Sequence, residues 1–207
     1  MDISMSGSPS TLMNPSYPSR RMLNGLKVFP ARRFDDERGF FTELYNEFLP
    51  SLPDELKGNV GQVNVSYSVK GTVRGMHYQL DPPMGKFFRL IKGSILLIEI
   101  DIRKNSPTYG EMETFYITDN HPYTVWIPFG FANGFMALED SLIGYACTGH
   151  YNPSTERAIN PLSANIKLHW EEAYAQFIGG EPNFIISKKD NEAPMLDKQK
   201  LFPYIEL

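Results

Sequence analysis

The sequence predicts an all-β fold, a sandwich or barrel of short strands. Residues 62–69 alternate strictly between an apolar face and a polar face, and the apolar face is formed by Val63, Val65, Tyr67 and Val69. Further strand-like runs follow at 86–91, 94–103, 111–118, 123–127, 132–138 and 141–149. Glycine and proline separate these runs, and no helical pattern lies between them. Short strands at this spacing are typical of sandwiches and barrels.

Two of these strands carry more information than the others. Residues 94–103 are nearly continuously apolar up to Glu99, which predicts a strand buried on both faces or at a subunit interface. The polar face of 62–69 has two interpretations: it faces water, or it lines the mouth of a barrel and orients a ligand. We favour the second, because the amides of Gln62 and Asn64 suit ligand binding better than solubility.

Helices are expected only at the periphery, at Thr42–Phe48 and at His169–Phe177. Residues 1–24 contain no continuous apolar run of the kind found in signal peptides, and we expect them to form a flexible N-terminal extension. Residues 25–207 are expected to form a single domain that includes a C-terminal segment.

The composition limits the class of protein. Of the 207 residues 42% are hydrophobic, which fits a globular core, and no run approaches the length of a membrane span. The single cysteine, Cys147, cannot form an internal disulfide and lies in an apolar stretch, so we expect it to be buried. A reducing, cytoplasmic location is the default expectation. Nucleic-acid binding is not expected at a net charge of −4 without a long basic face.

A local basic patch surrounds one histidine. Residues 70–92 contain one acid, Asp81, and five cations, namely Lys70, Arg74, Lys86, Arg89 and Lys92. A positive patch on an acidic protein indicates a bound anion. His77 within that patch could move a proton on the organic part of that anion. The alternative is a structural histidine at a solvated basic edge, and this stretch alone leaves both open.

A metal site is not expected. Small β-barrels that hold a metal often use two nearby histidines, a carboxylate and a later histidine. After His77 the residue two positions on is Gln79, and the turn that would carry the later histidine has Asn133. One imidazole without such partners holds a transition metal poorly, so we expect no metal and no other cofactor.

Several segments in a fixed order resemble one family. They are Asp36–Glu43, Gln62–Asn64, Arg74–Gln79, Gly85–Lys86, Asp101–Arg103, Ser106–Gly110, Trp126–Phe135, Tyr145 through Tyr151–Pro153, Lys189–Asp190 and Ala193–Leu196. Together they are similar to the dTDP-4-dehydrorhamnose 3,5-epimerases and related nucleotide-sugar epimerases. The resemblance covers roughly residues 25–197. It implies a cupin-type jelly-roll barrel with short peripheral helices, which works as a homodimer without a metal.

The resemblance also implies an activity. Such an isomerase inverts C3, C5 or both in a nucleoside-diphosphate 4-keto-6-deoxy sugar. The expected reaction is dTDP-4-dehydro-6-deoxyglucose to dTDP-4-dehydrorhamnose, a step of dTDP-rhamnose and polysaccharide biosynthesis. By resemblance His77 is the base, Asp190 orients it, and Tyr145 is the acid on the other face of the sugar. Lys86 then lies near the developing enolate oxygen.

The remaining expected site residues bind the substrate. Arg74 and Gln62 match positions that hold pyrophosphate or sugar, and Asn64 and Tyr151 also fall at family site positions. Arg38 and Glu43 match positions that reach the nucleotide, often from the partner subunit. A surface ion pair is the simpler interpretation of those two residues.

The chain departs from the family pattern at three positions. Asn133 replaces a histidine in the Phe-Ala-His-Gly-Phe turn, His150 replaces an aromatic residue that stacks on the base, and Val65 stands where a polar residue is frequent. Asn133 keeps its hydrogen-bonding groups and His150 can still stack, so both stay among the expected substrate-binding residues. These departures leave the nucleobase and the number of inverted carbons open. A 3-only or 5-only epimerase of a CDP or GDP sugar is one alternative, and a non-catalytic sugar-nucleotide-binding cupin is another.

Overall fold

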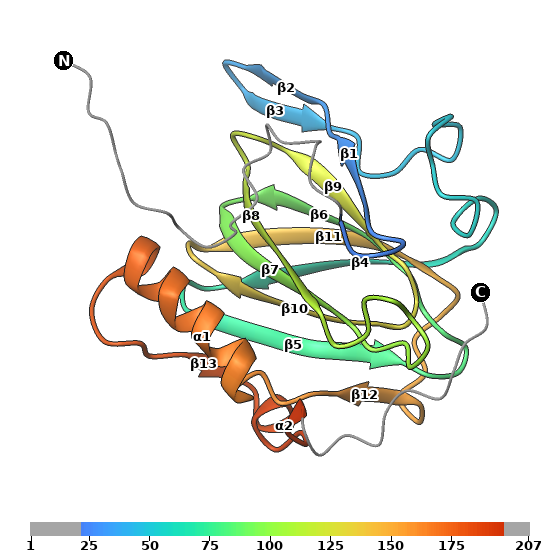
Figure 1. Ribbon diagram of the computed structural model, residues 1–207. Coiled ribbons are helices and arrows are strands. Elements are labelled where there is room, and N and C mark those ends of the chain that lie inside the picture. The colour runs from blue at the N-terminus through green and yellow to red at the C-terminus, as the bar shows by residue number, and fades with distance from the viewer. Residues whose placement is uncertain (1–21, 197–207) are drawn as a thin grey trace.

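Two antiparallel sheets face each other in the computed structural model, which describes residues 22–196 (Figure 1). The order of strands in the first sheet is β1 (Lys27–Pro30), β9 (Tyr123–Ile127), β6 (Lys86–Lys92), β11 (Ser141–Thr148) and β4 (Val60–Ser68). The order in the second is β12 (Glu156–Ala158), β5 (Thr72–Gln79), β10 (Phe131–Ala137), β7 (Ser94–Asp101) and β8 (Met112–Thr118). The short β13 (Ile185–Ile186) adds to β5 in parallel. The all-β prediction is confirmed.

A separate hairpin and three helical segments complete the described fold. The hairpin pairs β2 (Arg33–Asp36) with β3 (Gly39–Thr42) and projects beyond the first sheet (Figure 1). The helical segments are α1 (Ala164–Ala173), the π-helical turn η1 (Tyr174–Ile178) that continues it, and α2 (Lys188–Asn191). The helix expected at 169–177 is therefore confirmed, although it begins earlier, at Ala164.

The helix expected at Thr42–Phe48 is wrong. Thr42 ends strand β3, and the residues after it form an irregular connection to β4. Contacts with distant residues hold this connection, since the Arg89 guanidinium donates to the backbone carbonyl of Glu43 at 2.5 Å and also to the Thr42 hydroxyl. The Thr42 hydroxyl in turn donates to the carbonyl of Arg32 at 2.6 Å. These tertiary bonds use the polar groups that a helix start would need.

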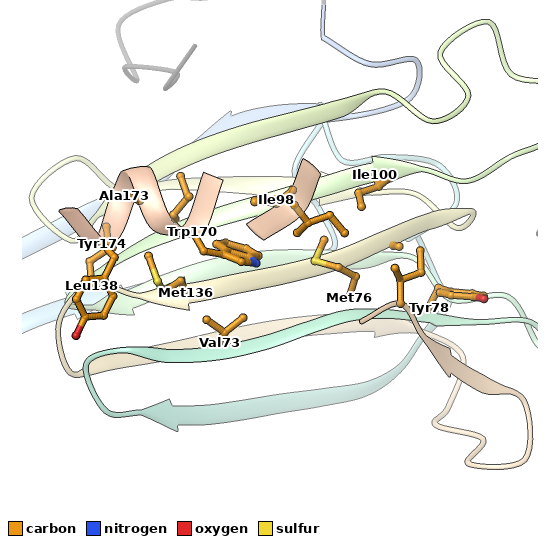
Figure 2. Close-up of a cluster of buried hydrophobic side chains, with 14 of the residues drawn as sticks. Val73, Met76, Tyr78, Ile98, Ile100, Met136, Leu138, Trp170, Ala173 and Tyr174 are labelled. Carbon is orange, nitrogen blue, oxygen red and sulfur yellow. The ribbon is translucent and has the colours of Figure 1, made fainter. Parts of the chain in front are cut away.

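Strand β7 is buried along its whole length, as expected for a strand covered on both faces. Its outward residues, including Ile98 and Ile100, join a cluster in which Trp170 of α1 packs against Met76 and Met136 (Figure 2). Its inward residues Ile95 and Leu97 pack between the sheets with aromatic and aliphatic residues from the facing strands. The next inward residue of β7, Glu99, is polar, so the apolar core between the sheets ends there.

Strand β4 turns its two faces to different environments. Val63, Val65 and Tyr67 point outward and are each more than half exposed, whereas Gln62 and Asn64 point inward and line a cavity. The position of Gln62 and Asn64 agrees with the second interpretation, and their part in orienting a ligand stays a prediction. The outward apolar face of β4 has no cover within the described chain.

The two chain ends are only partly described. The expected flexible extension 1–24 lies outside the described residues as far as residue 21, while Leu23 packs into the core between the sheets. Within 22–196, no helix is long and apolar enough to cross a membrane.

Candidate active site

Polar side chains from both sheets surround one hollow, which we call the central cavity. It has a volume of about 250 Å³ and adjoins a second hollow of about 240 Å³. The two hollows share six of their lining residues, namely His77, Lys86, Asn133, Tyr145, Tyr151 and Glu156. His77 and Asn133 come from the second sheet, and Lys86 and Tyr145 from the first, so the two walls belong to opposite sheets.

His77 forms a short hydrogen-bonded pair with Asp190. The distance from its Nε2 to the Asp190 Oδ1 is 2.7 Å, and the Asp190 side chain is only 5% exposed. Ser187 caps α2 by accepting from the Asp190 backbone N–H, which fixes the carboxylate behind the imidazole. Burial would raise the pKa of Asp190, but hydrogen bonds from His77 and from the Gly75 N–H hold it below its ordinary value. The carboxylate is thus charged at neutral pH and orients the imidazole.

Tyr145 faces the central cavity from the opposite sheet. Its position on β11 lies between Asn64 of β4 and Phe88 of β6, and its ring stacks on Phe88 with centroids 6.2 Å apart. Burial, with a smaller contribution from Cys147, raises the pKa of the Tyr145 phenol. A phenol with a raised pKa keeps its proton at neutral pH and can donate it.

Lys86 reaches across the barrel to Asn133. Its Nζ donates to the Asn133 Oδ1 at 3.2 Å, and the Asn133 Nδ2 donates to the Glu99 Oε1 at 2.5 Å. Burial lowers the pKa of Lys86, while the charges of Cys147, Glu99 and Glu156 raise it. Burial likewise raises the pKa of Glu99 well above its ordinary value.

Five of the expected substrate-binding residues line one or both hollows, namely Gln62, Asn64, Arg74, Asn133 and Tyr151. Gln62 donates to the Asn64 Oδ1 at 2.6 Å and accepts from the Tyr151 backbone N–H at 2.9 Å, which links β4 to the loop after β11. Arg74 lines the second hollow, where its guanidinium donates to the Ser68 hydroxyl at 2.9 Å. Cys147 is buried, as expected, and its side chain lies in the wall of the central cavity.

Three expected residues lie elsewhere in the described chain. Arg38 is exposed in the β2–β3 hairpin, where it pairs with Asp36 at 2.5 Å. Glu43 lines a different hollow of about 470 Å³, together with Phe34 and Phe41 of the hairpin. His150 is exposed and lines neither of the two hollows around His77.

Two carboxyl groups were missed by the sequence analysis. Glu156 lines both hollows and bonds with Lys189 and with the Tyr151 hydroxyl, the latter at 2.9 Å. Its only sequence signal is its place a few residues after the Tyr151–Pro153 motif. Glu99 gave a clearer signal, since an acid interrupts an otherwise apolar strand there.

Histidine, cysteine and carboxylate side chains are the groups that could hold a metal ion. Among residues 22–196, no three of them lie close enough together to hold an ion. His77 already bonds to the Asp190 carboxylate, and its cross-strand partner on β10 is Asn133.

Comparisons with known proteins place this geometry in a family. The family model described as dTDP-4-dehydrorhamnose 3,5-epimerase matches residues 20–198. The chain belongs to the dTDP-4-dehydrorhamnose 3,5-epimerase family. It is 36% identical to the enzyme of that name from Methanothermobacter thermautotrophicus over 169 residues, which is 81% of this chain and 88% of the relative. The chain is accordingly an isomerase of this family.

Solved structures of epimerases share its fold. The dTDP-6-deoxy-D-glucose-3,5-epimerase from Legionella pneumophila, in complex with dTDP-4-keto-L-rhamnose, superposes with a TM-score of 0.75 at 30% identity, covering 90% of this chain and 97% of that one. A 3'-monoepimerase from Streptomyces bikiniensis in complex with dTDP-quinovose gives 0.73 at 26% identity, covering 84% and 85%. The expected cupin-type jelly roll is confirmed by these likenesses.

Proposed function

We propose that the chain inverts carbon centres beside the ketone of a dTDP-4-keto-6-deoxy sugar, and that it converts dTDP-4-dehydro-6-deoxyglucose to dTDP-4-dehydrorhamnose. One observation carries the proposal. A histidine held by a buried carboxylate and a protonated tyrosine line the same cavity from opposite sheets. Epimerisation needs a base on one face of a sugar ring and an acid on the other.

The chemistry follows from the 4-ketone, which acidifies the hydrogens on both neighbouring carbons. His77 takes the hydrogen of C3 or C5 as a proton, and the electron pair of that C–H bond becomes an enolate with its charge on the ketone oxygen. The Lys86 ammonium stabilises this oxygen anion by charge and hydrogen bonding. Tyr145 returns a proton to the same carbon from the opposite face, which inverts the centre. The Asp190 carboxylate stabilises the imidazolium formed on the way.

The nucleotide part of the substrate carries two phosphate charges. Arg74 lies in the second hollow beside Tyr145 and His77, and a guanidinium matches phosphate oxygens with two parallel hydrogen bonds. Gln62, Asn64 and Tyr151 supply further polar groups along the same wall. His150 is exposed beside Tyr151, where an imidazole can stack on a base that extends out of the cavity.

A homodimer would bring the two remaining expected residues, Arg38 and Glu43, to the nucleotide of the partner subunit. Arg38 and Glu43 do not line the central cavity of their own chain, so we expect them to serve the nucleotide of a second copy. Two apolar surfaces are available for that contact: Phe34 and Phe41 on the hairpin, and Val63, Val65 and Tyr67 on β4. Exposed apolar surface of this kind on a soluble domain is typical of an interface.

A single-centre epimerase is the second candidate. Asn133 removes a titratable group from a position where the family pattern has histidine, and the relative from Streptomyces bikiniensis is a 3'-monoepimerase. With one proton-transfer group fewer, one of the two carbons would stay unchanged.

Incubation of the protein in deuterated water with dTDP-, CDP- and GDP-4-keto-6-deoxy sugars tests both candidates. The main proposal predicts deuterium at C3 and C5 of the dTDP sugar and an inverted product. Deuterium and inversion at one carbon would support the single-centre enzyme. Binding without any deuterium would leave only a sugar-nucleotide-binding protein.

A further inference from the structure

A row of four polar side chains crosses the second sheet beside the central cavity. His77 of β5, Asn133 of β10, Glu99 of β7 and Glu113 of β8 are successive cross-strand partners. Residues directly opposite each other in antiparallel strands project to the same face of the sheet. Because His77 and Asn133 line the central cavity, Glu99 projects to the cavity side of β7, immediately behind Asn133.

Glu99 is buried without being fully hydrogen-bonded. The residue is 0% exposed, and one carboxyl oxygen accepts from Asn133 at 2.5 Å. The other oxygen has no hydrogen-bond partner among residues 22–196. Burying a carboxyl group in this way is costly, and an apolar residue would suit the core better. A buried acid with an unbonded oxygen therefore indicates a role other than packing.

The Asn133 amide joins this acid to Lys86. Its carbonyl oxygen accepts from the Lys86 ammonium at 3.2 Å, and its NH2 group donates to Glu99. The negative end of the amide dipole thus faces the cation and the positive end faces the acid. We propose that Glu99 is a positioning residue of the epimerase site, which acts through Asn133 as the counter-charge of Lys86. This inference rests on the proposed function, in which Lys86 meets the enolate oxygen.

A negative charge on Glu99 favours the ammonium form of Lys86. Burial lowers the pKa of Lys86 and raises the pKa of Glu99, and the attraction between the ammonium and the carboxylate opposes both effects. The other titratable groups around the pair come from four strands and one loop. They are Cys147 and Tyr145 on β11, Tyr151 in the loop after it, Glu156 on β12, His77 and Tyr78 on β5, and Glu113 on β8. Of these, Cys147 raises the pKa of Lys86 more than Glu99 does, and Glu156 raises it less. Loss of the Glu99 charge should lower the pKa of Lys86, so that the ammonium loses its proton at a lower pH.

Asn133 suits this connection because an amide does not titrate. It offers one acceptor to Lys86 and one donor to Glu99 at every pH, so the charge state of the pair depends on its two ends. A histidine at the same position could make the same two bonds with its two ring nitrogens. The chain-specific asparagine is thus compatible with a working site.

The test compares Glu99→Gln with a matched control, Glu113→Gln, which removes a buried carboxyl one strand further from Lys86. Competitive labelling of lysines with acetic anhydride over a pH series, read by mass spectrometry, reports the titration of Lys86 without any substrate. Glu99→Gln should move the Lys86 midpoint down by about one pH unit, a tenfold change, since one unit of pKa is a tenfold shift in equilibrium. Glu113→Gln should leave it within a few tenths of a unit.

Kinetics of the same variants add the second readout. In Glu99→Gln the alkaline limb of kcat/KM should move to lower pH together with the Lys86 midpoint. The loss should appear as a lower kcat and not as a higher KM. Asn133→Leu, which removes both hydrogen bonds of the amide, should shift the alkaline limb by the same amount. Asn133→His, which can make both bonds, should not show this shift. The double variant Glu99→Gln, Asn133→Leu should shift the limb no further than either single variant.

Two results would overturn the inference. One is a wild-type Lys86 titration in a folded Glu99→Gln variant. The other is a wild-type Lys86 titration in Asn133→Leu. This second variant keeps the inference testable if Glu99→Gln does not fold. Because labelling needs no substrate, a shifted Lys86 titration in an inactive protein would refute the proposed function and not the Glu99 connection.

Discussion

His77 and Tyr145 lie on opposite walls of one cavity, His77 on β5 of the second sheet and Tyr145 on β11 of the first. A ring held between the two sheets exposes one face to the imidazole and the other to the phenol. Two residues on the same sheet could exchange protons on only one face and would leave the configuration unchanged. The fold itself therefore separates the proposed base from the proposed acid.

Asp190→Asn should reduce deuterium exchange and epimerisation together. The amide cannot stabilise the imidazolium and permits the wrong orientation of His77, for which losses of about 10²–10⁴-fold in kcat are typical. Because the pKa of Asp190 lies below its ordinary value, the wild-type carboxylate is charged at and above neutral pH. Substrate affinity, measured by calorimetry, should stay close to wild type, and a large loss of affinity would contradict an orienting role.

Arg103→Met should strongly destabilise the fold. Arg103 and Asp101 form an ion pair at 2.7 Å with both side chains almost fully buried, and its loss leaves a buried carboxylate unpaired. The expected loss is about 3–5 kcal/mol of unfolding free energy in denaturant titrations. Lys57→Met, which breaks an exposed pair at 2.7 Å with Asp54, is the control and should change little.

The same pair gives a pH dependence. Burial would raise the pKa of Asp101, but hydrogen bonds from Arg103, Ser106 and Thr108 hold it below its ordinary value of 3.8. A lowered pKa means that the stabilisation is complete above about pH 4 and is lost as the pH falls through the native pKa. In Arg103→Met the loss of unfolding free energy on acidification should be smaller than in wild type. An unchanged loss would show that other carboxyl groups cause it.

We predict a homodimer that uses the hairpin and the outer face of β4. Phe41→Asp and Val65→Asp place a charge on surfaces that are 67% and 61% exposed in the single chain, and each should shift sedimentation towards the monomer. Leu168→Asp on α1, which is 56% exposed, is the matched control and should not. A stable monomer with full activity would refute the dimer and the role of Arg38 and Glu43 in a partner's site.

Activity should survive complete removal of divalent ions. The expected chemistry uses His77, Lys86 and Tyr145, and the two histidine positions of metal-binding barrels are occupied here by Gln79 and Asn133. Dialysis against a strong chelator should leave the turnover rate within error of the untreated enzyme. Loss of activity that one particular divalent ion restores would show that a metal takes part.

Sequence reasoning found what local pattern and family motifs encode. Alternation revealed the inward amides and outward apolar residues of β4, and unbroken apolarity revealed the burial of β7. The partnership of His77 with Asp190 came from the resemblance alone, since the two are 113 positions apart and α2 carries no catalytic pattern of its own. The helix expected at 42–48 failed because Arg89, distant in sequence, binds that segment. Glu99 was missed because its partners, Asn133 and Lys86, come together only when the sheets face each other.

The central claim is that His77 removes the proton and Tyr145 returns one from the other face. Deuterium incorporation measured beside product formation tests it directly in wild type, His77→Ala and Tyr145→Phe. His77→Ala should stop both processes. Tyr145→Phe should lose most epimerisation but keep some exchange, because His77 can still remove a proton and return a deuteron on its own face. Wild-type epimerisation by Tyr145→Phe, or normal exchange by His77→Ala, would contradict the assignment of base and acid.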